Sequence, residues 1–213
     1  RNAAEAHRML AASKKHPQLV TQIVPSPLGL AQHNTICDLM DEGFLGDFRE
    51  LVVIGADASF ADTSQPLHWR QETSISGMNV LALGILHEAA IRWAPAPTRV
   101  FAQTKIFEPQ RPVSSRSDAT EVTVPDSVQI LTQLEGGGRG LYHLGGLNLF
   151  GPGFQIHLYG SQGTIRFHIG PQEKLLVGRT GEAELHEAEI SEEKRGGWRV
   201  EAEFIYTNSS VKS

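Results

Sequence analysis

One short region of the sequence combines side chains that bind polar ligands. Trp69 and Arg70 are adjacent, and the apolar stretch Gly77–Trp93 that follows contains Asn79 and His87. A guanidinium can donate two parallel hydrogen bonds to hydroxyls or a carboxylate, and ligand pockets combine an apolar wall with a few polar groups. We therefore predict that these four residues bind the substrate, with His87 as a candidate acid or base. The structural alternative stays open: Trp69 packs, Arg70 is a surface cation and His87 is a hydrogen-bonded core histidine.

Other patterns that often carry chemistry point to ordinary structure. The glycine runs Gly136–Gly138 and Gly151–Gly153 do not lie between a strand and a helix, so they predict turns and not a phosphate cradle. His33 and Cys37 are four residues apart, but two ligands do not make a metal site, and we predict no bound metal. No G-x-S-x-G motif is present, so acyl transfer has no support.

Composition limits the class of protein. The 213 residues are 40% hydrophobic and 20% charged, and a formal net charge of -5 disfavours nucleic-acid partners, which require many cationic contacts. No apolar run is long enough to cross a membrane, and the start lacks a secretory pattern. The single cysteine fits a reducing compartment. We therefore predict a cytoplasmic protein that binds small molecules, with no nucleic-acid or membrane partner.

Hydrophobic periodicity and helix-stop signals divide the first half of the chain into helices and strands. We predict, in order, helix Ala3–Lys15, strand Leu19–Val24, helix Leu30–Glu42, strand Phe48–Ala58 and a buried helix over Gly77–Trp93.

The second half has β patterning. Strands are predicted at Arg99–Phe107, Ser127–Leu134, Gly140–Leu147, Phe154–Tyr159, Thr164–Ile169, Lys174–Val177 and Ala183–Ala188. Gly160–Gly163 and Gly136–Gly138 predict hairpin turns, because glycine adopts the positive φ that tight turns need. Short connections favour antiparallel neighbours. The expected fold is α+β: an open, mostly antiparallel sheet with helices on one face, whose other face needs a cover.

The order of several short motifs resembles the glucose-fructose oxidoreductase / inositol dehydrogenase / MocA (Gfo/Idh/MocA) family from the first residues almost to Ile205. The matching segments are Asn2–Ala6, which resembles the helix after that family's Glu-Lys-Pro; Leu39–Phe48, which resembles L-I-x-x-G-x-L-G-x-I; Trp69 through Gly77, which resembles W-R-x…S-G-G; Ile156–Ile165, which resembles I-x-G-x-x-G-x-L; and Gly197–Glu201, which resembles the start of a late helix.

The resemblance implies a domain organisation and a cofactor. Members pair a Rossmann domain, which carries G-x-G-x-x-G and a catalytic lysine, with an open sheet that shapes a sugar pocket. It implies that residues 1–24 are the last helix and strand of the dinucleotide-binding domain, and that 25–213 are a C-terminal substrate-binding and dimerisation domain, truncated at its end. The full-length parent would use NAD or NADP. This chain contains neither upstream motif, so we expect no tight cofactor binding by it.

The implied activity is hydride transfer between NAD(P) and a hydroxyl of a sugar or cyclitol. This chain would be the substrate-binding half and would be inactive alone. It would form homo-oligomers through the open sheet face. One departure matters. The family often has D-x-G-x-H in the active-site helix, and alignment on Gly84 puts Ala82 and Leu86 at those two positions, with His87 turned by about 100°. A non-catalytic binding or scaffolding protein is therefore an alternative, as is a fragment without independent function.

Overall fold

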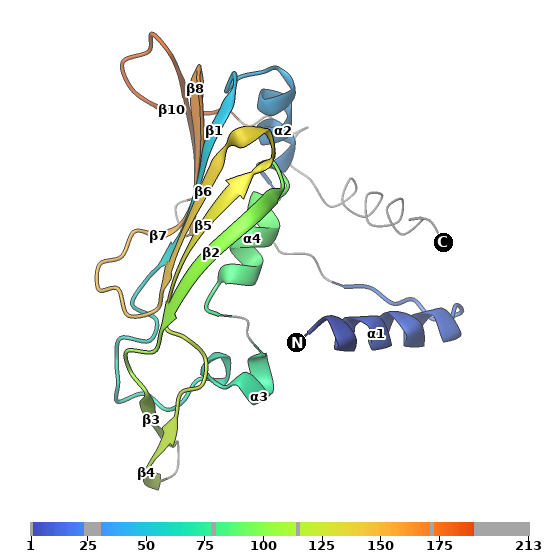
Figure 1. Cartoon of the computed structure of the whole chain (residues 1–213), viewed down its shortest axis with the longest axis vertical. Coiled ribbons are helices and arrows are strands. Elements are labelled where there is room, and N and C mark those ends of the chain that lie inside the picture. The colour runs from blue at the N-terminus through green and yellow to red at the C-terminus, as the bar shows by residue number, and fades with distance from the viewer. Residues whose placement is uncertain (1, 24–30, 78–79, 114–115, 171–172, 190–213) are drawn as a thin grey trace.

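The computed structural model describes residues 2–23, 31–77, 80–113, 116–170 and 173–189 (Figure 1). Its centre is an eight-stranded sheet in the order β10-β9-β8-β7-β1-β6-β5-β2. The strands are β1 Phe48–Ala56, β2 Pro97–Lys105, β5 Ser127–Leu134, β6 Arg139–Gly145, β7 Gly153–Gly160, β8 Gly163–Ile169, β9 Lys174–Arg179 and β10 His186–Glu187. Every neighbouring pair is antiparallel except β1 with β6, which are parallel.

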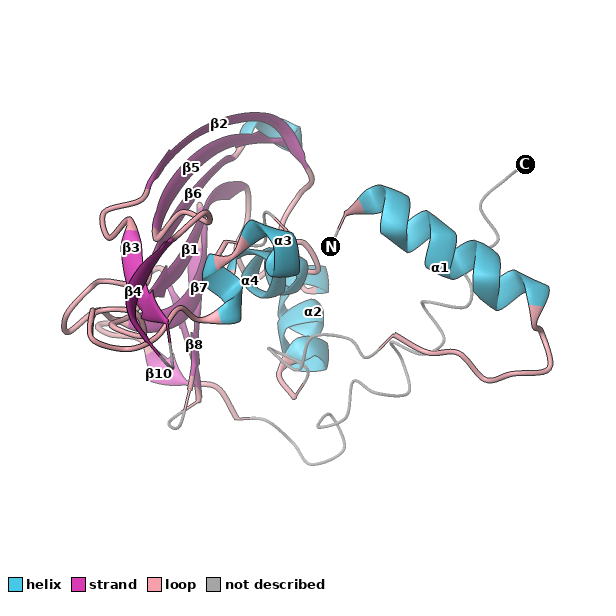
Figure 2. Cartoon of the chain, turned by 90° about the horizontal axis from the view of Figure 1, so that it is seen from below, coloured by secondary structure: helices cyan, strands magenta, loops and turns pink. Residues whose placement is uncertain are grey.

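Helices cover one face of this sheet. The α-helices are α1 Ala3–Lys15, α2 His33–Asp41, α3 Thr73–Ser76 and α4 Leu83–Ala90, and short 3-10 turns occupy η1 Trp69–Gln71 and η2 Glu135–Gly137. Figure 2 shows α2, α3 and α4 on the same side of the curved sheet. The predicted fold class, an open and mostly antiparallel sheet with helices on one face, is therefore confirmed.

The core lies between α4, α2 and the helix-side face of the sheet. Leu86 of α4 is fully buried, as are Val53 of β1 and Leu144 of β6. Gly55 of β1 lets the helix approach this closely, because a Cβ atom there would lie 2.6 Å from Cδ1 of Leu86. The close contact fixes α4 over the middle of the sheet.

The opposite face, which we call the open face, carries a row of side chains that runs across the strands. The register pairs Phe101 with Leu131, Leu131 with Leu141, Leu141 with Val52, and Val52 with His157, so these five side chains share one face. Three of them remain well exposed: Phe101 at 68%, Leu131 at 54% and Leu141 at 39%. Apolar surface on this face is therefore continuous over β2, β5 and β6.

Helix α1 has the predicted bounds and clear capping. Asn2 accepts a hydrogen bond from the backbone N of Glu5 at 2.9 Å, while Lys14 and Lys15 lie in the last turn, where cations are favourable. No residue of α1 is buried, and Figure 1 shows the helix apart from the sheet. The division of the chain into 1–24 and 25–213 stays a prediction.

Two predicted elements differ from the structure: one strand is absent, and one helix is shorter than predicted. Leu19–Ile23 contains no strand, and Leu19, Val20 and Ile23 are 60, 96 and 78% exposed; the last predicted residue, Val24, lies outside the described residues. A strand needs a neighbour to satisfy its backbone, and no described strand lies beside this segment.

The helix predicted over Gly77–Trp93 is shorter, Leu83–Ala90. Gly77 has φ +65 and ends α3. Leu81 has φ 52, a left-handed conformation, so α4 cannot extend towards the N-terminus through this residue. A continuous apolar run shows burial but carries no period, so the sequence could not fix these boundaries.

A second, two-stranded sheet was not predicted. It consists of β3 Gln110–Val113 and β4 Arg116–Glu121. β2 ends at Lys105, and the carboxylate of Asp126 then accepts the backbone N–H groups of Phe107 and Glu108 at 2.9 and 3.0 Å. This buried carboxylate stabilises the bend at which the chain leaves the main sheet, and the segment that contains the hairpin follows.

The remaining strands match the sequence analysis within a few residues, and Ser127–Leu134 matches in full. Both hairpin turns are confirmed: β7 and β8 are joined across Ser161 and Gln162, and η2 joins β5 to β6. No described helix is long and apolar enough to cross a membrane.

Candidate substrate-binding site

The first group of candidate residues lies in the loop that follows β1. His68 precedes η1, and its side chain accepts a hydrogen bond from the backbone N of Arg70 at 3.2 Å. The side chain of Gln71 accepts in return from the backbone N of His68 at 3.0 Å. These reciprocal bonds form a capping box, which fixes the orientation of Trp69 and Arg70 between them.

Four side chains of this loop form a row of contacts, which we call the stack, in which the neighbouring rings are tilted by 45° and 33°. The ring centroids of Phe60 and His68 are 5.6 Å apart, those of His68 and Trp69 are 5.5 Å apart, and Cζ of Arg70 lies 4.1 Å from the centroid of the Trp69 ring. Trp69 is 45% exposed and Arg70 is half-buried. We call Trp69 and Arg70 the indole–guanidinium platform: a part-exposed aromatic ring with a cation over it.

The protonation of His68 follows from its surroundings. Burial and, second, the charge of Arg70 lower the pKa of His68, so the neutral imidazole dominates at neutral pH. Because Nδ1 accepts the N–H of Arg70, the ring proton belongs on Nε2. Nε2 is therefore a hydrogen-bond donor beside the platform.

His87 lies on α4 and has a different partner. Its Nδ1 is 3.0 Å from the hydroxyl of Tyr142 on β6, and the two rings are 5.8 Å apart. Burial raises the pKa of Tyr142 to about 12, so this phenol keeps its proton at neutral pH and can donate it to Nδ1. The preceding residue, Leu86, is fully buried against the sheet, so position 86 faces the core and cannot present a side chain to a substrate.

The structure thus brings two of the four predicted site residues together. Trp69 and Arg70 stack on each other, while the contacts found for His87 are to Tyr142 on another element. Asn79 lies outside the described residues. Sequence reasoning missed His68, although it is next to Trp69, and it had no signal for Tyr142, which is 55 positions from His87.

His33 and Cys37 do not form a reactive pair. The sulfur of Cys37 lies 3.8 and 3.7 Å from the two ring nitrogens of His33, and Nε1 of Trp93 donates to Nδ1 of His33 at 3.1 Å. Burial, followed by the charges of Asp41 and Asp38, raises the pKa of the Cys37 thiol, which therefore stays protonated. Across the described part of the chain, no three His, Cys, Asp or Glu side chains gather closely enough to hold a metal ion.

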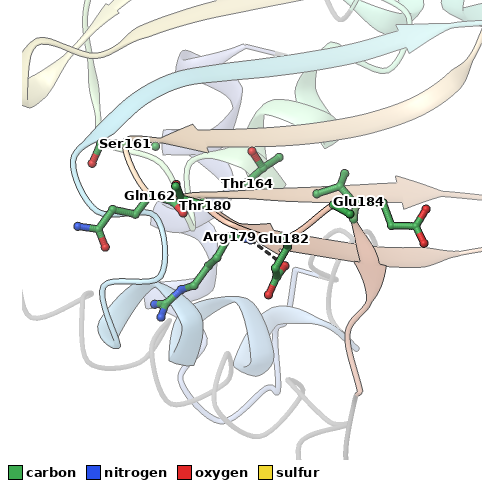
Figure 3. A pocket seen from close by; sticks show the side chains of 12 residues that line it. Ser161, Gln162, Thr164, Arg179, Thr180, Glu182 and Glu184 are labelled. Atoms are coloured by element: carbon green, nitrogen blue, oxygen red, sulfur yellow. Dashed lines mark hydrogen bonds between the residues drawn. The ribbon is translucent and has the colours of Figure 1, made fainter.

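Two hollows lie elsewhere, at the β8–β10 edge of the sheet. One, of about 330 Å³, is lined by the β7–β8 and β9–β10 connections (Figure 3). Its Glu182 carboxylate accepts the backbone N–H of Arg179 at 2.9 Å and so stabilises the turn itself. The other, of about 510 Å³, lies between α2 and β9–β10. Neither is lined by a predicted site residue, so we keep the platform and the His87–Tyr142 pair as two separate parts of the candidate site.

Comparison with known families identifies the central part of the chain. The model of the GFO/IDH/MocA C-terminal domain matches residues 33–166, which include β1, the platform, α4 and most of the sheet. Comparison of the sequence with curated proteins gives no match.

Several solved structures share the fold. An oxidoreductase domain protein from Kribbella flavida is 21% identical with a TM-score of 0.72 over 89% of this chain and 54% of its own. An inositol dehydrogenase homolog from Azotobacter vinelandii, complexed with NAD+, is 20% identical with a TM-score of 0.65 over 87% and 47%. A levoglucosan dehydrogenase, in complex with NADH and levoglucosan, is 19% identical with a TM-score of 0.65 over 82% and 50%. The chain spans about half the length of these proteins.

Proposed function

Because this chain belongs to the GFO/IDH/MocA family, we propose that it is the substrate-binding half of an oxidoreductase that transfers hydride between NAD or NADP and a hydroxyl of a sugar or cyclitol. The observation that carries this proposal is the indole–guanidinium platform. The exposed part of the Trp69 side chain can pack against the C–H groups of a sugar ring, and Arg70 can donate to adjacent hydroxyls. A levoglucosan dehydrogenase with the same fold is bound to NADH and L-sorbose in one structure, which agrees with a sugar substrate.

The proposal assigns residues 1–24 to the end of a nucleotide-binding domain and 25–213 to the substrate domain. The nicotinamide would supply the hydride chemistry, and this chain would bind and orient the sugar. Its glycine runs Gly136–Gly138 and Gly151–Gly153 connect strands to strands, so neither run has the strand-to-helix position of a dinucleotide cradle. We expect the isolated chain to be inactive and to bind NAD(P) negligibly in calorimetry; micromolar affinity would contradict this.

The genomic sequence upstream of Arg1 tests the assignment directly. A glycine-rich strand-turn-helix and a Glu-Lys-Pro immediately before Arg1 are expected. If both are missing, the dehydrogenase proposal fails.

His87 is the candidate for proton movement. With Nδ1 held by the hydroxyl of Tyr142, the imidazole keeps a fixed orientation and its Nε2 remains to face a ligand. General acid–base work requires this kind of oriented imidazole within hydrogen-bond reach of the reacting hydroxyl.

A non-catalytic binding or scaffolding protein is the alternative, and the observation that favours it is the pair Ala82 and Leu86 at the positions expected for Asp and His. Leu86 is buried and Ala82 caps α4 without a side-chain hydrogen bond. Sugar binding without any NAD(P)-dependent turnover by the full-length parent would support the alternative; turnover that His87→Ala abolishes would exclude it.

Binding is tested by titrating levoglucosan, L-sorbose and inositol against the wild type and Trp69→Ala, with Phe150→Ala as the control for removal of an exposed aromatic ring. Loss of the platform should weaken binding about tenfold, because one lost stacking or hydrogen-bonded contact is of that size. Equal affinity of the wild type and Trp69→Ala would refute the platform as the sugar site.

We also propose that the open face pairs with a second copy of the chain. Separately, we propose that the parent protein is cytoplasmic. Phe101, Leu131 and Leu141 form a continuous exposed apolar surface on the open face, of the kind that marks interfaces. Sedimentation should give a dimer that Leu131→Lys dissociates and that Leu149→Lys, on an exposed loop, preserves. A monomeric wild type would contradict the dimer, and cell fractionation tests the location.

A further inference from the structure

Arg111 on β3 is a buried cation that has only neutral acceptors. It is 2% exposed, and its guanidinium donates to the backbone carbonyls of Asp62 and Phe60. No ion pair found among the described residues includes Arg111, and the carboxylate of Asp62 is occupied by hydrogen bonds from Ser64 and Gln65. The guanidinium is therefore buried with no direct ion pair among the described residues, although the Asp62 carboxylate is near enough to interact with its charge.

Burying a charge in this way is costly, so the arrangement calls for a compensating role. A planar guanidinium can hold two carbonyls at once in a fixed geometry, which an ammonium cannot. The two carbonyls belong to residues two positions apart, in the loop that leaves β1 and leads to η1. Arg111 thus fixes the backbone of that loop at Phe60.

Phe60 is the first member of the stack that ends at the platform. Its ring lies 5.6 Å from that of His68, which lies 5.5 Å from Trp69, on which Arg70 rests. A shift of Phe60 therefore changes the support of His68 and, through it, of the indole.

The rest of the hairpin segment is fastened to the same loop on both sides of the platform. Before it, the backbone N of Leu67 donates to the carbonyl of Pro112 at 3.1 Å. After it, the backbone N of Thr123 donates to the carbonyl of Gln71 at 2.9 Å, and Thr73 donates two hydrogen bonds to Thr123, from its backbone N and from its hydroxyl. The hairpin and the loop form one hydrogen-bonded unit, with Arg111 as its buried contact.

We infer that Arg111 is a positioning residue for the indole–guanidinium platform: it holds Phe60, and through the stack it sets the orientation of Trp69 and Arg70. The inference gives the hairpin β3–β4 a part in the site, although no residue of it needs to touch the sugar. That the platform binds a sugar rests on the proposed function. That the orientation of Trp69 depends on Arg111 does not rest on it.

The direct test is ¹⁹F NMR of the chain labelled with 5-fluorotryptophan, with the Trp69 resonance identified by Trp69→Phe. In Arg111→Met, we expect the Trp69 resonance to shift or broaden, while that of Trp93, buried in the core at 5% exposure, stays in place. Arg8→Met, an exposed arginine on α1, is the matched control and should leave both resonances unchanged. An unchanged Trp69 resonance in Arg111→Met overturns the inference.

Arg111→Lys covers the case in which Arg111→Met does not fold, as judged by loss of the Trp93 resonance. Lysine keeps the charge and can reach one carbonyl, so a Trp69 resonance that moves from its wild-type position while the Trp93 resonance stays in place supports the inference. A Trp69 resonance identical to that of the wild type in Arg111→Lys overturns it, since the two-carbonyl geometry would then be dispensable.

Sugar titration of the same samples separates the two proposals. Arg111→Met should bind about tenfold more weakly than the wild type, and Arg111→Lys should recover part of the loss. A wild type that binds no sugar, together with a displaced Trp69 resonance in the variant, refutes the proposed function and leaves the positioning role intact. Unchanged affinity with a displaced resonance refutes the role of Arg111 in binding.

Discussion

His157 is expected to make the stability of the fold depend on pH. It lies on β7 in the open face and is only 8% exposed; Nδ1 is 3.1 Å from the hydroxyl of Tyr159, and Nε2 is 2.8 Å from Oε1 of Gln155. Burial and, after it, the charges of Arg166 and His168 lower the pKa of His157 from 6.5 to about 4. The folded chain therefore holds this imidazole neutral over a range in which the unfolded chain protonates it.

The size of the effect follows from these two values. Above pH 6.5 neither state binds the proton and the contribution is constant; as the pH falls from 6.5 towards 4, only the unfolded state gains a proton, and folding free energy is lost. At about pH 5 the loss amounts to about 2 kcal/mol, and it approaches about 3 kcal/mol below the folded pKa.

The assay is urea unfolding of the wild type and His157→Gln at about pH 7.5 and about pH 5. Glutamine cannot titrate and keeps hydrogen-bonding groups for Tyr159 and Gln155, so the change in free energy between the two pH values should be about 2 kcal/mol smaller in the variant. His7→Gln, which removes an exposed imidazole on α1, should keep the wild-type dependence. Equal pH dependence in the wild type and His157→Gln would refute the reasoning.

Three further outcomes are expected. Leu86→Ala should destabilise the fold by about 2–5 kcal/mol in thermal unfolding, because a fully buried side chain is lost, whereas Leu149→Ala, at 69% exposure, should stay within about 0.5 kcal/mol. Arg70→Ala should weaken sugar binding by about 1–3 kcal/mol in calorimetry, with partial recovery in Arg70→Lys; unchanged affinity would make Arg70 a surface cation. Tyr142→Phe should cost about 0.5–1.5 kcal/mol in urea unfolding, by loss of the hydrogen bond to His87, and no cost would show that the bond contributes nothing.

The sequence predicted those parts of the fold where local pattern and tertiary environment agree. Helix Ala3–Lys15 carries its own cap and charges, and strand Ser127–Leu134 alternates between the two faces as its periodicity indicates. Leu19–Ile23 has strand composition but no pairing partner among the described strands, and composition alone cannot supply one. The β3–β4 hairpin depends on distant contacts such as Arg111 with the carbonyls of Asp62 and Phe60, which leave no local signal.

The candidate site was predictable to a similar degree. Trp69 and Arg70 are neighbours in the chain, so their proximity was certain, and the stack adds their orientation. His87 was singled out as a polar group on a buried helix, but the sequence contains no sign of its partner Tyr142, which comes from a strand 55 positions away. Pairings of that kind are set by the sheet register, which is a property of the whole fold and not of a motif.

The place of β1 has a consequence for the order in which the molecule assembles. β1 is central in the sheet, yet its partners β6 and β7 lie about a hundred residues further along the chain. The local hairpins β5–β6 and β7–β8 can close early, since their loops are short, but they join into one sheet only when β1 enters between them. During synthesis β1 therefore emerges with both edges unpaired, before its partner strands are made. Pairing of β1 with β6 and β7 is the step that completes the sheet. Until then the unpaired edges of β1 are exposed to aggregation.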